Sequence, residues 1–85
     1  MSNRNYVNGV YRERKIVNQA RDDGMISFRS AGSHSIIDVI VIDTEHHVIK
    51  LIQCKPESMS SNAKSKLLSS LSYIDGQYSV VTSVL

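Results

Sequence analysis

Three polar side chains, Asp38, Gln53 and Lys55, lie inside or at the end of two predominantly apolar runs of the sequence. Asp38 lies in the first run, residues 35–42, where strand alternation would place it on one face with isoleucines. Gln53 and Lys55 share a face at the end of the second run, residues 48–55. Burying a lone carboxylate or ammonium is costly, so we expect these groups to meet one another, an ion or water in a cleft. A carboxylate, an amide oxygen and an ammonium together suit a divalent cation and phosphate chemistry.

Each of the three residues also has a plain structural interpretation. An isolated Asp in a strand commonly accepts a hydrogen bond from a loop, and a Gln-x-Lys at a strand end commonly marks where the strand reaches solvent. Their occurrence together on adjoining strands favours a functional site.

The elements that must position these side chains start with a helix over residues 6–22. One stripe of this helix is apolar, with Glu13 near its middle; its members are Tyr6, Val10, Ile16, Val17 and Ala20. Arg12 and Lys15 fall on the opposite side. Glu13 would therefore point at whatever the helix covers, and if that is the sheet bearing Asp38, the two carboxylates converge. The alternative is a Glu at the edge of the stripe that reaches water.

The rest of the sequence predicts four strands, counting the two apolar runs, and a second helix. Gly24 suits the residue after the first helix, residues 25–30 suit a half-buried strand, and the two apolar runs form a hairpin through residues 43–47. A helix follows Pro56, with an apolar face of Met59, Ala63, Leu67, Leu68, Leu71 and Ile74, and residues 77–85 suit a last strand beside the hairpin. The prediction is one α/β domain over residues 1–85, a mixed β-sheet with flanking helices in the order α-β-β-β-α-β.

Composition and charge limit the classes of function that the chain can have. The net charge is +2, from ten Lys and Arg against eight Asp and Glu, which favours a polyanionic partner only if the charges cluster. The single cysteine, Cys54, excludes an internal disulfide and suits an intracellular, cytoplasmic setting. Neither a secretory signal nor a membrane-length apolar run is visible, so no membrane association is expected. A core this small would gain from dimerisation.

Four segments together resemble a known family. They are Glu13-Arg14, Phe28-Arg29-Ser30-Ala31-Gly32-Ser33, Ile37-Asp38-Val39-Ile40 and Leu51-Ile52-Gln53-Cys54-Lys55. In this order they resemble the archaeal-type Holliday junction resolvases of the PD-(D/E)xK nuclease superfamily. The resemblance covers residues 9–56, and the Arg-Ser-Ala-Gly-Ser segment is its most specific part. The sequence leaves three sources open, a cellular archaeon, a virus or a plasmid.

The resemblance implies a restriction-endonuclease-like core and a metal-dependent DNA endonuclease that resolves four-way junctions by paired nicks as a homodimer. Mg²⁺ or Mn²⁺ would be held by Glu13, Asp38, Gln53 and the backbone carbonyl of Cys54, with Lys55 completing the catalytic set of Glu13, Asp38, Gln53 and Lys55. The DNA backbone would be held by Arg14, Arg29, Ser30, Gly32, Ser33 and His34.

Two other functions stay open. Gln53 stands where many relatives have Glu and offers a neutral oxygen, which allows a nuclease-derived protein that binds branched DNA with weak or no cleavage. A small interaction module is the third hypothesis. His46 and His47 in the hairpin loop are interpreted as solvated polar residues rather than a metal site or general base.

Overall fold

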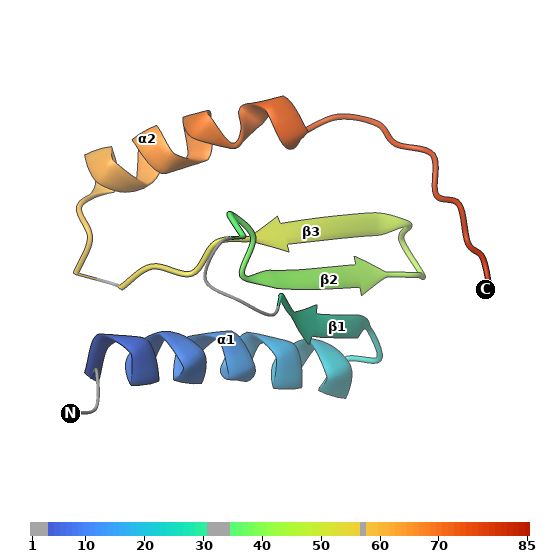
Figure 1. Ribbon diagram of the computed structural model, residues 1–85, viewed down its shortest axis with the longest axis horizontal. Coiled ribbons are helices and arrows are strands. Elements are labelled where there is room, and N and C mark those ends of the chain that lie inside the picture. The colour runs from blue at the N-terminus through green and yellow to red at the C-terminus, as the bar shows by residue number, and fades with distance from the viewer. Residues whose placement is uncertain (1–3, 31–34, 57) are drawn as a thin grey trace.

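The computed structural model describes residues 4–30, 35–56 and 58–85. Its elements are α1 (Arg4–Asp22), β1 (Ile26–Arg29), β2 (Val39–Asp43), β3 (Val48–Ile52), α2 (Ser61–Ser70) and a 3-10 turn η1 (Ser72–Ile74). The strands form one antiparallel sheet in the order β1-β2-β3, with α1 along one side and α2 on the other (Figure 1). This arrangement confirms the α/β class. No described helix is long and apolar enough to cross a membrane.

Helix α1 ends in a Schellman motif around Gly24. The N–H of Met25 donates to the carbonyl of Ala20 at 2.9 Å, and the N–H of Gly24 donates to the carbonyl of Arg21 at 3.0 Å. Gly24 has a φ of +85°, which residues with a Cβ rarely adopt, so the predicted helix end is confirmed.

The core lies between α1 and one face of the sheet. Val17 and Ala20 of α1 are buried against Val39 and Val41 of β2, and Val39 is fully buried. Ser27 is buried on the same face, where its hydroxyl donates to the carbonyl of Ile40 at 2.9 Å. The apolar stripe predicted for the first helix therefore does face the sheet, although the side chain of Tyr6 is outside the described part.

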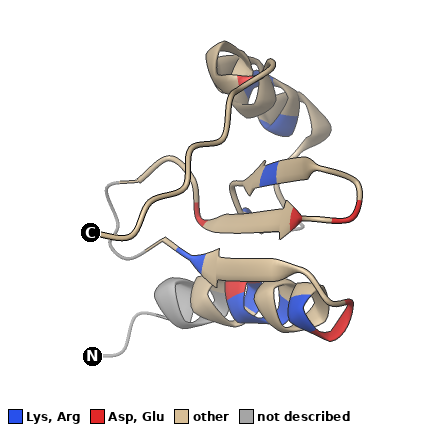
Figure 2. Cartoon of the chain, turned by 90° about the vertical axis from the view of Figure 1, so that its right-hand side faces the viewer, with Lys and Arg blue, Asp and Glu red and all other residues tan. Residues whose placement is uncertain are grey.

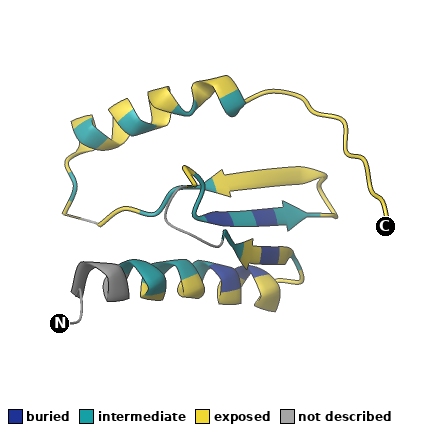
Figure 3. Ribbon diagram, viewed as in Figure 1, coloured by how far each residue is buried: buried dark blue, intermediate teal, exposed yellow. Residues whose placement is uncertain are grey.

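The opposite face of the sheet carries large apolar side chains that stay accessible. The strand register places Ile42 between Ile26 and Ile49, and Ile40 between Phe28 and Leu51. Ile26, Phe28, Ile49 and Leu51 are 40–53% exposed, and β3 is exposed along most of its length (Figure 3). Helix α2 lies on this side of the sheet but buries none of its residues.

Three predictions about the elements need correction. Residues 77–85 form no strand and are exposed, because β-branched residues make a strand only where a partner strand and a packing surface are present. Every described strand pair is antiparallel, so the sheet is not mixed. The second apolar run leaves the sheet at Ile52 instead of continuing to Lys55. The hairpin itself is confirmed, with residues 44–47 as its loop.

Candidate functional site

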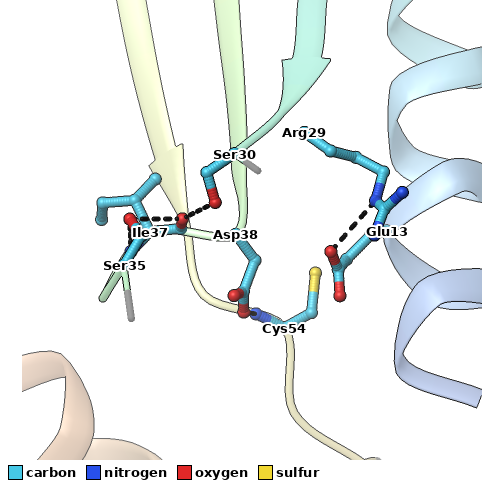
Figure 4. A network of polar contacts seen from close by, with 7 residues as sticks. All are labelled: Glu13, Arg29, Ser30, Ser35, Ile37, Asp38 and Cys54. Atoms are coloured by element: carbon cyan, nitrogen blue, oxygen red, sulfur yellow. Dashed lines mark hydrogen bonds and ion pairs between the residues drawn. The ribbon is translucent and has the colours of Figure 1, made fainter. Parts of the chain in front are cut away.

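Asp38 immediately precedes β2, and its backbone continues the hydrogen bonding of β2 toward both β1 and β3. Its backbone N–H donates to the carbonyl of Ile52 at 2.8 Å, and its carbonyl accepts from the N–H of Ser30 at 3.0 Å. The side chain adds a third link, because Oδ2 accepts from the backbone N–H of Cys54 at 2.8 Å (Figure 4). The carboxylate thus takes the place of a ladder carbonyl and fixes the chain where it leaves β3.

Glu13 reaches the same region from the middle of α1. Its Oε1 accepts from Nε of Arg29, at the end of β1, at 3.2 Å. The Glu13 side chain is 16% exposed and that of Arg29 is 31% exposed, so the ion pair is partly shielded from water. Glu13 points inward, as its place in the apolar stripe predicts.

The two carboxylates converge on Cys54. The pKa of the Cys54 thiol is raised, first by burial and then by the negative charges of Asp38 and Glu13, while the Arg12 guanidinium acts in the opposite direction. All three charged groups therefore lie within electrostatic range of one sulfur atom, and Figure 4 shows the thiol between the two carboxylates. The guanidinium groups of Arg29 and Arg12 oppose the charges of the two carboxylates here.

The donor set at this position suits a hard metal ion only in part. Asp38 and Glu13 each use one oxygen in a hydrogen bond described above, and among the described residues their second oxygens accept none. Those oxygens are the kind of ligand that Mg²⁺ and Mn²⁺ prefer. Within the described ranges, however, no group of three or more His, Cys, Asp and Glu side chains could hold a metal ion.

Gln53 and Lys55 follow the end of β3 and border an adjacent groove. This α1–α2 groove has a volume of about 870 Å³ and a floor of leucine and isoleucine side chains from α1, β3 and α2. Gln53 is half-buried and Lys55 is exposed. In the described part of the chain neither side chain has a hydrogen bond to Glu13 or Asp38. The four predicted catalytic residues thus form two pairs. Glu13 and Asp38 lie near Cys54, whereas Gln53 and Lys55 border the groove.

The residues expected to hold DNA fall into three groups. Arg29 is engaged with Glu13, and the Ser30 hydroxyl donates to the carbonyl of Ile37. Arg14 is exposed on α1. The remaining members of this set, Gly32, Ser33 and His34, lie outside the described residues.

Sequence reasoning missed Arg12 as a site residue. It was placed on the outer side of α1, yet it is half-buried, borders the groove with Lys15 and acts on the Cys54 thiol. Its Nε atom is buried and has no hydrogen-bond partner among the described residues. The available signal was the spacing from Arg12 to Lys15, because residues three apart lie on one side of a helix.

The hairpin histidines form a separate structural feature. Asp43 Oδ1 accepts from the backbone N–H groups of Glu45 and His46, both at 3.1 Å, and Oδ2 lies 2.9 Å from Nδ1 of His46. These interactions, led by the backbone N–H of His46, lower the pKa of Asp43 from its usual 3.8. His47 has a φ of +55° in the same turn. His46 therefore helps to cap the turn.

No protein-family model matches the sequence, and neither curated proteins nor solved structures match it.

Proposed function

We propose that the chain is a metal-dependent, structure-selective DNA endonuclease that nicks four-way junctions. The observation that carries this proposal is the convergence of Glu13 and Asp38 on Cys54. The two carboxylates come from separate elements, and each has a second oxygen that could reach a cation. The sequence resemblance to junction resolvases supports the choice of substrate.

In this proposal each residue has a defined part. Glu13 and Asp38 would hold Mg²⁺ or Mn²⁺, with the Gln53 amide oxygen and the Cys54 carbonyl as neutral ligands. The bound ion would lower the pKa of a water molecule and offset the charge that develops on the scissile phosphate. Lys55 would orient the attacking water or stabilise that charge. Hydrolysis then breaks one P–O bond and leaves a nicked strand.

Paired nicks require two copies of this site, so we propose a homodimer. The exposed apolar side chains Ile26 and Phe28 on the edge strand β1 support this part, because exposed apolar residues of this kind are commonly covered by another chain. Junction selectivity would come from the spacing of the two sites and from phosphate contacts.

A second function, branched-DNA binding without cleavage, is favoured by a specific contact. The Glu13 carboxylate already faces the Arg29 guanidinium at 3.2 Å, which offsets its charge. Gln53 adds no charge in compensation. Cation affinity would then fall while exposed basic residues such as Arg14 could still bind DNA.

The test is cleavage of a labelled four-way junction and a matched linear duplex in Mg²⁺, in Mn²⁺ and in EDTA. The proposal expects paired nicks in the junction that require metal and are lost in Glu13→Gln and Asp38→Asn. Gln53→Glu is expected to raise activity at low metal concentration, because it adds a third carboxylate. Metal-dependent nicking that survives Asp38→Asn would refute the site assignment. Junction binding without nicking in any metal would establish the second function instead.

A further inference from the structure

The α1–α2 groove collects positive charge beyond the one cation, Lys55, that the proposed cleavage site uses. Arg12 and Lys15 border it from α1, Lys55 from the segment after β3, and Lys64 from α2. No Asp or Glu is among the described residues that line it. Figure 2 shows basic residues on both helices that flank the sheet. A chain whose net charge is only +2 thus places four cations around one groove, which favours an anionic occupant.

Arg12 links this groove to the proposed cleavage site. Arg12 and Cys54 both line the groove, and the backbone N–H of Cys54 donates to Asp38 Oδ2 at 2.8 Å, so Arg12 borders both regions. The charge of its guanidinium would attract a phosphate group bound in the groove.

The lining of the groove favours a single strand over a duplex. The floor is apolar, and the Tyr11 side chain at its border is 68% exposed. Single-strand binding sites combine these features, with cations following the phosphates and bases resting on aromatic or apolar groups.

We propose that the α1–α2 groove binds one unpaired DNA strand, with its phosphates on Arg12, Lys15, Lys55 and Lys64 and a base against Tyr11. This inference rests on the proposed function only in taking DNA as the polyanion. The two DNA strands would separate next to the carboxylates, and the groove would bind one of them. It assigns binding to Lys15 and Lys64, which the resemblance leaves without a role.

The test is fluorescence anisotropy of a labelled oligothymidylate with the full chain in EDTA, so that cleavage plays no part. Four phosphate contacts predict that log K falls with log salt concentration with a slope of about −3, since each contact to a single strand contributes about 0.7. Lys15→Gln combined with Lys64→Gln should reduce the slope by about 1.4. Tyr11→Leu should weaken binding about fivefold, the lower end of what one stacked base contributes.

The matched control is Lys66→Gln on α2, which removes the same charge two residues from Lys64 and outside the groove lining. It should leave the slope within experimental error of the unchanged protein. Three results would each overturn the proposal. They are an equal reduction of the salt slope in Lys66→Gln and in the Lys15→Gln, Lys64→Gln double variant, tighter binding to a duplex of the same length, and displacement of the oligothymidylate by polyglutamate at equal charge.

The cleavage assay keeps the two proposals separate. Oligothymidylate binding that depends on Lys15 and Lys64, without nicking, would support the groove and refute the endonuclease. Nicking that depends on Asp38, without oligothymidylate binding, would do the reverse.

Discussion

Asp38→Ala is expected to weaken the fold as well as to abolish metal-dependent cleavage. The Asp38 carboxylate accepts the backbone N–H of Cys54 at 2.8 Å, and alanine leaves that donor without its acceptor. Hydrogen bonds to charged groups contribute about 1.5–3 kcal/mol, and the partial exposure of Asp38 favours the lower value. A loss of about 1.5 kcal/mol corresponds to a fall in Tm of about 6–12 °C for a domain of this size.

Asp38→Asn separates the structural part from the chemical part. The asparagine side chain has the same shape and keeps a carbonyl oxygen for the Cys54 N–H, so only the charge assistance is lost. We expect the stability loss to be about half of that in Asp38→Ala or less, because a neutral hydrogen bond still contributes about 1 kcal/mol. Cleavage should nevertheless be abolished, because the negative charge that attracts the cation is gone.

The assay is thermal unfolding followed by circular dichroism in EDTA, with Asp75→Ala as the control. Asp75 is an exposed carboxylate whose side chain has no hydrogen bond in the described part of the chain, so its removal should change stability by less than about 0.5 kcal/mol. A Tm for Asp38→Ala equal to that of the unchanged protein would refute the linking role of the carboxylate. Equal losses for Asp38→Ala and Asp38→Asn would show that charge, rather than the retained acceptor, controls stability at this position.

Three further predictions concern the fold. Gly9→Ala should raise the free energy of unfolding by about 0.5–1 kcal/mol, because a Cβ there approaches no atom closer than 3.8 Å. Gly24→Ala should lower the free energy of unfolding by about 1 kcal/mol, because the φ of Gly24 is +85°. Urea denaturation of both variants tests this difference in sign. Val39→Ala should lower the free energy of unfolding by about 2 kcal/mol, since Val39 is fully buried, and an unchanged denaturation midpoint would contradict the assigned core. The lowered pKa of Asp43 stabilises the fold above pH 3.8, and this contribution is lost as the pH falls through the lower folded-state pKa. Asp43→Asn should therefore lose less stability than the unchanged protein on acidification from about pH 5 to about pH 2, and parallel losses would argue against the His46 interaction.

The helix end and the hairpin could be predicted because local chemistry determines them. Gly24 is the residue type that the end of α1 requires, and alternating β-branched residues set the two hairpin strands. The prediction of a last strand was wrong because residues 77–85 have a suitable composition but no partner strand in the structure. Strand composition describes a fit to a half-buried surface, and only the tertiary arrangement supplies that surface.

The carboxylate pair was also predictable, whereas the surroundings of the pair were not. The period of α1 showed that Glu13 points at the sheet, and alternation identified Asp38 as an exception among apolar residues. The ion pair between Glu13 and Arg29 depends on which strand lies under the middle of α1, and a helical pattern does not contain this information. The place of Arg12 beside the groove depends on the position of α2, which is equally non-local.

The strand register that builds the core also brings the two carboxylates together. Val39 of β2 is paired with Arg29 of the neighbouring strand β1, and Asp38 immediately precedes Val39. On α1, Glu13 precedes Val17 by four residues, so the two side chains lie on the same side of the helix one turn apart. Packing Val17 against Val39 therefore carries Glu13 to Arg29, beside Asp38. A slip of one residue in β2 would exchange the two faces of that strand, removing Val39 from the core and Asp38 from the Cys54 N–H in the same step. Core packing and the candidate site thus depend on one register.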